Sequence, residues 1–263
     1  MKQGIKETLK RKEWMQALQF VKKNFWHINY VKTLFLNMKW LPLRQALHFP
    51  IIVGTHVDLR DTHGSFEIEG GVHFGMFQLS FDYIPTDTQN NRVVLVNHGK
   101  IIIKGNVYIR SGVKIWVEEK GVLSFGGENA IGTNTLIVCQ KKVEFGFFVV
   151  CAWNCQIYDT NFHFFRDMET GDVMKRSSFV KLADHVWIGN SVHLTKGTRL
   201  PKGCLVSNRS VVNRSFMKEG ENIMIAGHPA VKVLDGIEKI KGENFMDGSA
   251  EAELMAQLEG RLA

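Results

Sequence analysis

Between residues 182 and 212, every sixth residue of this chain is aliphatic. The residues four positions after the first five of these are small or narrow. A period of six matches neither the 3.6-residue period of an α-helix nor the two-residue alternation of a lone strand. It is typical of a parallel β-helix, in which short strands alternate with tight corners. The six aliphatic positions are Leu182, Ile188, Leu194, Leu200, Val206 and Val212.

A rougher form of the same period precedes this run. Near Val143 the positions of the repeat shift by two residues, and the period of six then continues from the new position. We expect three six-residue units to form one triangular coil, with the first residue of each unit pointing inward. Stacked coils would then bury a continuous aliphatic column. The earlier members of this column are Ile103, Ile109, Ile115, Ile131, Ile137, Phe145, Cys151 and Ile157.

Changes in composition divide the chain into three parts. Residues 1–50 carry apolar residues at helical spacing, which predicts an N-terminal amphipathic helical segment. Residues 51–235 are rich in short β-forming runs and form the expected β-helix domain, with an extruded loop at 159–178. Residues 236–263 leave the repeat and are expected to form a short helix that covers the open end of the stack. The predicted fold class is therefore mainly β.

The formal net charge of +7 is concentrated at the N-terminus. Residues 1–44 contain ten Lys or Arg against Glu7 and Glu13. No nucleic-acid-binding motif accompanies this charge, so nucleic acid is not an expected partner. Two interpretations remain for the helical segment: its apolar face packs on the β-helix or on a neighbouring subunit, or it lies on an anionic membrane. The residues expected at such a membrane are Trp14, Phe20, Phe25, Trp26 and Lys22 or Lys23.

The cysteines and the hydropathy pattern indicate the compartment. The four cysteines lack the paired spacing of a zinc site, so we expect reduced core residues and no metal ion. No apolar run approaches the 18 or more residues of a membrane span, and no stretch resembles a secretory leader. We therefore expect a cytoplasmic protein, soluble or at most peripheral to the inner membrane face. The cysteines are Cys139, Cys151, Cys155 and Cys204.

The six-residue pattern fails between Asp159 and Ser178. A segment of about twenty residues without the repeat is unusual in a compact stack, so we treat it as functional. Within it His163 follows Asp159 by four residues, and aromatic and basic side chains surround the pair.

Five short motifs resemble those of the hexapeptide-repeat acyltransferases, and most closely the branch that acetylates sugars of bacterial surface polysaccharides. The resemblance covers about residues 101–233, and it implies a left-handed parallel β-helix that works as a homotrimer. The motifs are residues 157–163 (IYDTNFH), 186–190 (VWIGN), 196–198 (KGT), 206–212 (VSNRSVV) and 226–230 (AGHPA).

The resemblance implies that acetyl-CoA donates an acetyl group to a sugar hydroxyl in a capsule, lipopolysaccharide or exopolysaccharide. This reaction needs a base for the hydroxyl proton and donors for the oxyanion. The motif implies His163 as the base, because a neutral imidazole accepts a proton near pH 7. Asp159 either orients that imidazole or caps the loop. The aromatic rings of the loop either stack on the sugar or anchor the loop, and the candidate acceptor-binding residues are Asn161, Phe162 and Arg166.

Coenzyme A in this family lies in a groove between adjacent β-helices. The matching positions here include corner asparagines, which are also favoured at corners for their tolerance of left-handed dihedral angles. Asn208 replaces a residue that is usually small in the family, and Val231 replaces a frequent Lys or Arg, so that Lys232 would supply the phosphate contact. The implied cofactor-binding residues are Trp187, Asn190, Lys196, Asn208, Asn213, Arg214 and Lys232.

Three alternatives remain open. The chain could transfer acetyl to the nitrogen of an amino sugar, or it could be a non-catalytic β-helix scaffold. A β-helical metal enzyme of the carbonic anhydrase type would need three histidines that converge on zinc. No two histidines here are four or five residues apart, which disfavours that alternative.

Overall fold

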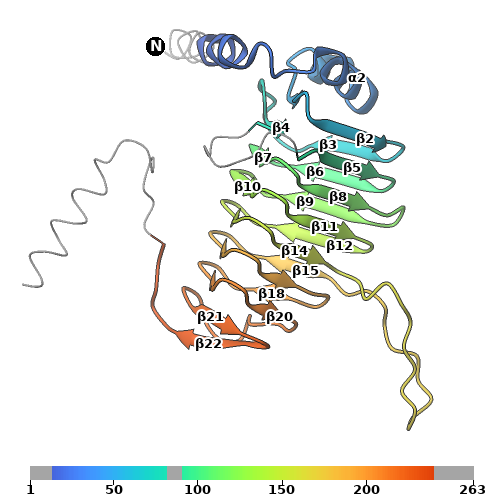
Figure 1. Ribbon diagram of the computed structural model, residues 1–263, viewed down its shortest axis with the longest axis vertical. Helices are drawn as coiled ribbons and strands as arrows, with labels where there is room; N and C mark the ends of the chain where they lie inside the picture. Colours follow the sequence, from blue (N-terminus) through green and yellow to red (C-terminus); the bar gives the residue numbers. More distant parts are fainter. Residues whose placement is uncertain (1–13, 82–90, 240–263) are drawn as a thin grey trace, which may run out of the picture.

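The computed structural model describes residues 14–81 and 91–239, and these form a parallel β-helix with a helical layer at one end (Figure 1). Three sheets run along the stack, and their strand order shows that each coil contributes one strand to each sheet. The predicted mainly β class is therefore confirmed. The expected C-terminal helix falls within residues 240–263, outside the described residues.

The strands of the three sheets have these bounds. The first sheet contains β1 (Ile51–Val53), β4 (Phe77–Leu79), β7 (Val107–Ile109), β10 (Asn129–Ile131), β13 (Val150–Cys151), β16 (Trp187–Ile188), β19 (Leu205–Val206), β21 (Met224–Gly227) and β22 (Ala230–Leu234). The second contains β2 (Val57–Asp61), β5 (Val93–Asn97), β8 (Lys114–Val117), β11 (Leu136–Cys139), β14 (Gln156–Tyr158), β17 (His193–Leu194) and β20 (Val211–Val212). The third contains β3 (Ser65–Ile68), β6 (Lys100–Ile103), β9 (Val122–Phe125), β12 (Lys142–Phe145), β15 (Val180–Leu182) and β18 (Arg199–Leu200).

The residues of the six-residue repeat fill the interior. In the second sheet Ile137, Ile157 and Leu194 are in register on successive strands, and all three side chains are fully buried. The six aliphatic residues of the run from Leu182 to Val212 are likewise fully buried, which confirms the predicted inward column. The four cysteines are also buried and free, as expected for reduced core residues.

The phase shift in the sequence is a wider corner between the second and third sheets. Eight residues separate the inward Ile137 from the inward Phe145, whereas six separate Leu194 from Leu200. The two additional residues lie in the turn between β11, which ends at Cys139, and β12, which begins at Lys142. The segment from Asp159 to Ser178 therefore falls where the stack changes from wide to narrow corners.

Helices cover the N-terminal end of the stack (Figure 1). Residues 14–24 are helical, and α2 (Tyr30–Trp40) and the short α3 (Leu43–Ala46) follow. The Asn29 side chain caps α2 by accepting the N–H of Lys32 at 3.0 Å. The Asn37 side chain donates to the C=O of Ile51 at 2.7 Å and accepts its N–H at 3.2 Å. The helix thus supplies partners to backbone groups that an open sheet edge would leave unpaired.

Two side chains strengthen this attachment of α2 to the first coil. The ring of Trp40 stacks on Phe66 with centroids 5.3 Å apart, and the Thr33 hydroxyl accepts the N–H of Val53 at 3.0 Å. At the other end of the stack, β22 pairs antiparallel with β21 and closes the first sheet. Among the described residues, no helix is both long and apolar enough to cross a membrane.

Candidate active site

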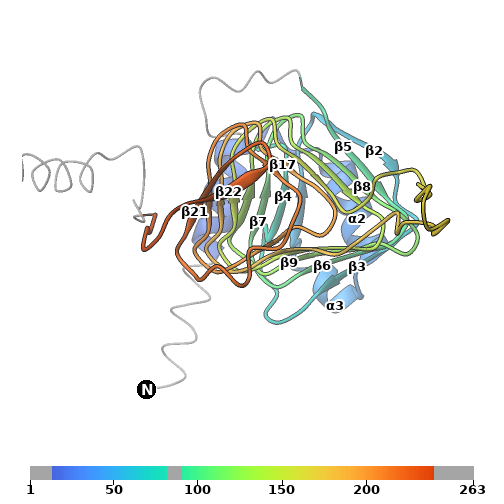
Figure 2. The ribbon, with the colours of Figure 1, turned by 90° about the horizontal axis from the view of Figure 1, so that it is seen from below.

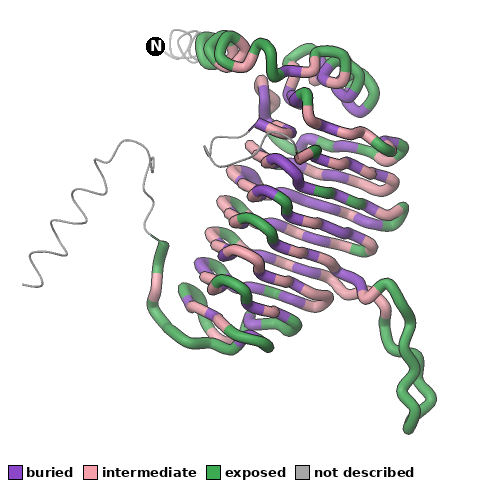
Figure 3. The backbone as a smooth tube through the Cα atoms, in the orientation of Figure 1, coloured by how far each residue is buried: buried purple, intermediate pink, exposed green. Residues whose placement is uncertain are grey.

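Residues 159–178 leave the β-helix at the corner between β14 and β15 and form an antiparallel arm (Figure 1). Backbone bridges join Thr160 to Ser177 near its base and Arg166 to Val173 near its tip. Almost the whole arm is exposed, in contrast to the coils beside it (Figure 3). The segment that breaks the repeat is therefore an ordered two-stranded projection.

The buried carboxylate of Asp159 fixes the base of this arm. One oxygen accepts the N–H of Gln140 at 2.8 Å, and the other accepts the N–H groups of Lys141 and Lys142 at 2.7 Å each. These three donors form the wide corner one coil earlier. Among the described residues, no hydrogen bond joins Asp159 to His163. The geometry therefore favours loop capping over imidazole orientation for Asp159.

Thr160 completes the base of the arm. Its buried hydroxyl donates to the side-chain oxygen of Gln140 at 2.7 Å and accepts the N–H of Phe162 at 2.9 Å. Phe162 adopts a positive φ of 64°, which turns the chain immediately before His163. His163 itself is exposed. The arm thus presents an accessible imidazole directly beside an anchored turn.

The predicted acceptor-binding residues lie along the arm but do not converge on one point. The N–H of Asn161 donates to the C=O of Arg176 at 2.9 Å, near the base. The guanidinium of Arg166 donates to the C=O of Gly171 at 3.2 Å, near the tip. Phe162 is 43% exposed and Phe164 is 66% exposed. These rings are therefore available to a ligand or to a neighbouring subunit.

Three of the predicted cofactor residues lie at the same corner as the arm. The ammonium of Lys196 donates to the C=O of Lys175 at 2.6 Å, so it holds the returning strand of the arm. Asn213 and Arg214 follow β20 at the corresponding corner of the next coil. The guanidinium of Arg214 pairs with Glu219 at 2.6 Å.

Two others lie at a different corner, between the first and second sheets. The side-chain oxygen of Asn208 accepts the N–H of Asn190 in the coil above at 2.9 Å. A Cβ atom at Gly189 would lie 2.3 Å from that same oxygen. The Asn208 side chain therefore joins two successive coils. This contact accounts for an Asn at a position where the family that the chain resembles usually has a small residue.

The last two predicted cofactor residues belong to the first sheet. Trp187 lies on β16, half-buried, with the ammonium of Lys239 5.9 Å from its ring centroid. Lys232 lies on β22, and its ammonium pairs with Asp235 at 2.9 Å. Within one chain, the candidate residues therefore line separate edges of the stack.

Sequence reasoning missed Gln140 and Thr160, which hold the base of the arm. Gln140 precedes Thr160 by twenty residues, and the two meet only because they belong to successive coils. The two-residue phase shift near Val143 was the available signal, because it marks the corner that receives Asp159. Among residues 14–81 and 91–239, no group of three or more His, Cys, Asp or Glu side chains is arranged to hold a metal ion.

Comparison with known proteins identifies similar solved structures but no sequence family. No family model matches the chain, and no curated protein matches it. The polysialic acid O-acetyltransferase OatWY aligns with 23% identity and a TM-score of 0.48, over 75% of this chain and 98% of its own. The polySia-specific acetyltransferase NeuO aligns with 17% identity and a TM-score of 0.47, over 77% and 99%.

A third similar structure is AntD, an N-acyltransferase from Bacillus cereus in complex with dTDP and 3-hydroxybutyryl-CoA. It aligns with 12% identity and a TM-score of 0.40, over 81% of this chain and 88% of its own. At these identities the likeness concerns the fold. The sheets and the arm described above therefore define the class of this protein, a parallel β-helix interrupted by a histidine-bearing arm.

Proposed function

We propose that this protein transfers an acetyl group from acetyl-CoA to a hydroxyl of a sugar in a bacterial surface polysaccharide. The observation that carries the proposal is the exposed His163, presented by an arm whose base is fixed by the three hydrogen bonds of Asp159. The motifs around His163 and along residues 186–230 support the same activity. A scaffold protein would not require an accessible imidazole at an anchored turn.

The chemistry follows from the position of His163. Its neutral imidazole takes the proton of the sugar hydroxyl while the oxygen attacks the thioester carbonyl carbon. A C–O bond forms, the C–S bond breaks, and the imidazolium returns the proton to the departing thiolate. Asp159 contributes by holding the arm at its base, which keeps the imidazole in place for the attack.

The cofactor groove would be shared between chains. Lys196, Asn213 and Arg214 share the corner of the arm, whereas Asn190 and Asn208 lie at another corner. In a homotrimer of parallel β-helices, the arm corner of one chain would face a neighbouring chain, so the two sets of residues could meet across the interface. The exposed rings of the arm would then be covered by the neighbour.

The acceptor would bind between the arm and that groove. Phe162 and Phe164 offer flat apolar faces for a sugar ring, and Arg166 offers a cation for an acidic sugar. The reaction would take place on the cytoplasmic side of the membrane, where acetyl-CoA is available. Transfer to the amine of an amino sugar is the alternative, and it would use the same base.

Titration calorimetry with acetyl-CoA tests the proposal, and the absence of binding would refute it. The His163→Ala variant should lose turnover while its affinity for coenzyme A changes by less than about twofold. His48→Ala is the matched control, because His48 is also exposed but lies at the N-terminal end. Wild-type activity in His163→Ala would exclude His163 as the base. Sedimentation velocity would test the trimer, for which three copies of the 30.0 kDa chain are expected.

A further inference from the structure

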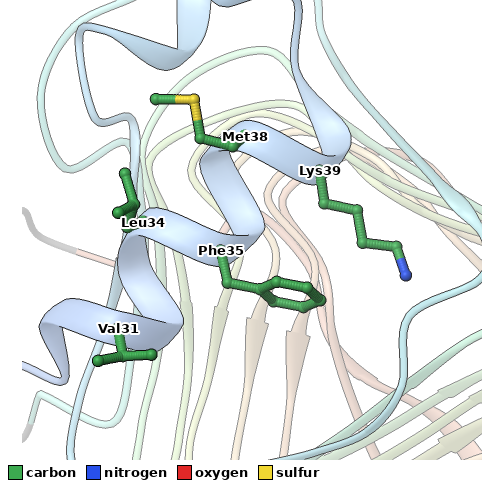
Figure 4. A pocket seen from close by; sticks show the side chains of 5 residues that line it. All are labelled: Val31, Leu34, Phe35, Met38 and Lys39. Atoms are coloured by element: carbon green, nitrogen blue, oxygen red, sulfur yellow. The ribbon is translucent and has the colours of Figure 1, made fainter.

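The helix α2 has apolar residues on two opposite faces. Its inner face packs on the first coil through Leu36 and Trp40. Its outer face, formed by Val31, Leu34, Phe35 and Met38, surrounds a surface hollow that Lys39 also lines (Figure 4). A helix face with this many exposed apolar side chains is normally covered by a partner. The β-helix covers one face only, so the outer α2 face requires an additional partner.

The N-terminal helical layer exposes further apolar side chains besides those of the outer α2 face. Val31 is 78% exposed and Phe35 is 47% exposed. Trp26, in the turn before α2, is 85% exposed, and Trp14 in the first described helix is 70% exposed. Exposed apolar groups this concentrated mark an interaction site on a folded protein. Further exposed apolar side chains of this region are Met15, Leu18, Phe25, Tyr30, Leu43 and Leu47.

The charges of this region have one sign. Residues 14–57 contain five Lys or Arg and no Asp or Glu. Four of these cations are exposed: Lys22, Lys23, Lys39 and Arg44. Lys39 lines the hollow of the outer α2 face itself. A partner that covers this face and the helical layer beside it must therefore combine apolar groups with negative charge.

A second copy of the chain does not fit this requirement. A symmetric contact would place the same patch on both sides, so the four exposed cations of one copy would face those of the other. Like charges opposed across an interface weaken it. An anionic lipid surface fits better, because acyl chains accept the aliphatic and aromatic side chains while the lipid phosphates pair with the lysines. Tryptophan at the boundary is typical of such surfaces.

We propose that the outer α2 face docks on a membrane that contains anionic lipids. The helices form a layer across the end of the β-helix, so docking would leave the coils standing on the membrane (Figures 1 and 2). Strand β14, which precedes the arm, lies four strand spacings from β2 in the second sheet, or roughly 19 Å. The arm therefore remains free in solvent when α2 is docked.

Vesicle co-sedimentation of the full-length chain tests this proposal. Wild-type protein should bind vesicles of phosphatidylcholine mixed with phosphatidylglycerol, because anionic lipids attract a polybasic surface. The Phe35→Glu/Met38→Glu variant should bind at least about tenfold more weakly, because the outer face then carries two acidic groups. Replacement of Lys22 and Lys23 by Gln should weaken vesicle binding by about fivefold for each charge removed.

The matched control is Val231→Glu/Val233→Glu, which alters two exposed valines on β22 at the opposite end of the stack. It should bind like the wild type, and circular dichroism melting should show that all variants fold. Equal loss of binding in this control would overturn the proposal, as would equal binding of the wild type to pure phosphatidylcholine. Failure to bind anionic vesicles would also overturn it. A lipid-free wild type that assembles beyond the proposed trimer, with Phe35→Glu/Met38→Glu remaining at the trimer, would assign the face to a second copy instead.

Discussion

Replacement of Asp159 by Ala should destabilise the protein much more than replacement of the neighbouring His163. The Asp159 carboxylate is fully buried and accepts three N–H groups at 2.7 to 2.8 Å. Loss of a buried partner costs about 1 to 3 kcal/mol for each orphaned donor. Because the three donors lie in a partly exposed corner, water can replace some of the bonds. We therefore expect the free energy of unfolding to fall by about 3 kcal/mol.

The assay is urea unfolding followed by circular dichroism for the wild type and for Asp159→Ala, Asp159→Asn and His163→Ala. His163 is exposed, so its replacement should change the free energy of unfolding by less than about 0.5 kcal/mol. Asn retains one acceptor oxygen but places an amide donor near a backbone donor, so Asp159→Asn should also be destabilised. A loss below about 1 kcal/mol in Asp159→Ala would refute the capping role of this carboxylate.

Three further predictions concern residues away from the arm. Gly189→Ala should lower the free energy of unfolding by about 2 kcal/mol in thermal melts, because the new Cβ atom would lie 2.3 Å from the side-chain oxygen of Asn208. Gly71→Ala is the neutral control, because a Cβ atom at Gly71 would have no atom within 4 Å. Burial raises the pKa of Cys204 to about 12, so thiol reagents at pH 8 should label it only after urea unfolding, and fast native labelling would contradict the buried position. The backbone N–H of His63, followed by the imidazoles of His63 and His98, lowers the pKa of Asp61. Stability from this group is present above pH 3.8 and is lost below it, so Asp61→Asn should show a smaller difference in melting temperature between pH 7 and pH 3 than the wild type.

The sign of the pH effect is opposite for the buried thiol of Cys204. Because the folded pKa of Cys204 lies above its ordinary value of 9.0, its contribution to stability is complete below pH 9 and is lost as the pH rises from 9 to 12. Cys204→Ser or Cys204→Ala would remove this alkaline sensitivity. An unchanged alkaline unfolding midpoint in these variants would argue against a titrating thiol at this site.

The N-terminal helices show where sequence reasoning reached its limit. Apolar spacing predicted helices before residue 50, and it left open whether their partner is the β-helix, a neighbouring subunit or a membrane. In the structure α2 packs on the first coil through Leu36 and Trp40, yet it retains a second apolar face. The spacing could not separate these faces, because both contribute apolar residues to the same eleven-residue helix.

The arm shows the same limit at the candidate site. Asp159 and His163 are four residues apart, which suggested a pair. The nearest partners of the Asp159 carboxylate are instead the N–H groups of residues 140–142, which lie in the preceding coil. In the same way, Asn208 meets Asn190 across eighteen residues.

The sequence alone determined the architecture of this protein, because each coil repeats the same division between inward and outward residues. A period of six records that division directly, and all six aliphatic positions of the run from Leu182 to Val212 are buried. Only the tertiary structure decided which corner side chains meet, because coil stacking joins residues about eighteen to twenty positions apart. The anchored arm, the separate corners of the cofactor candidates and the open face of α2 all result from that stacking.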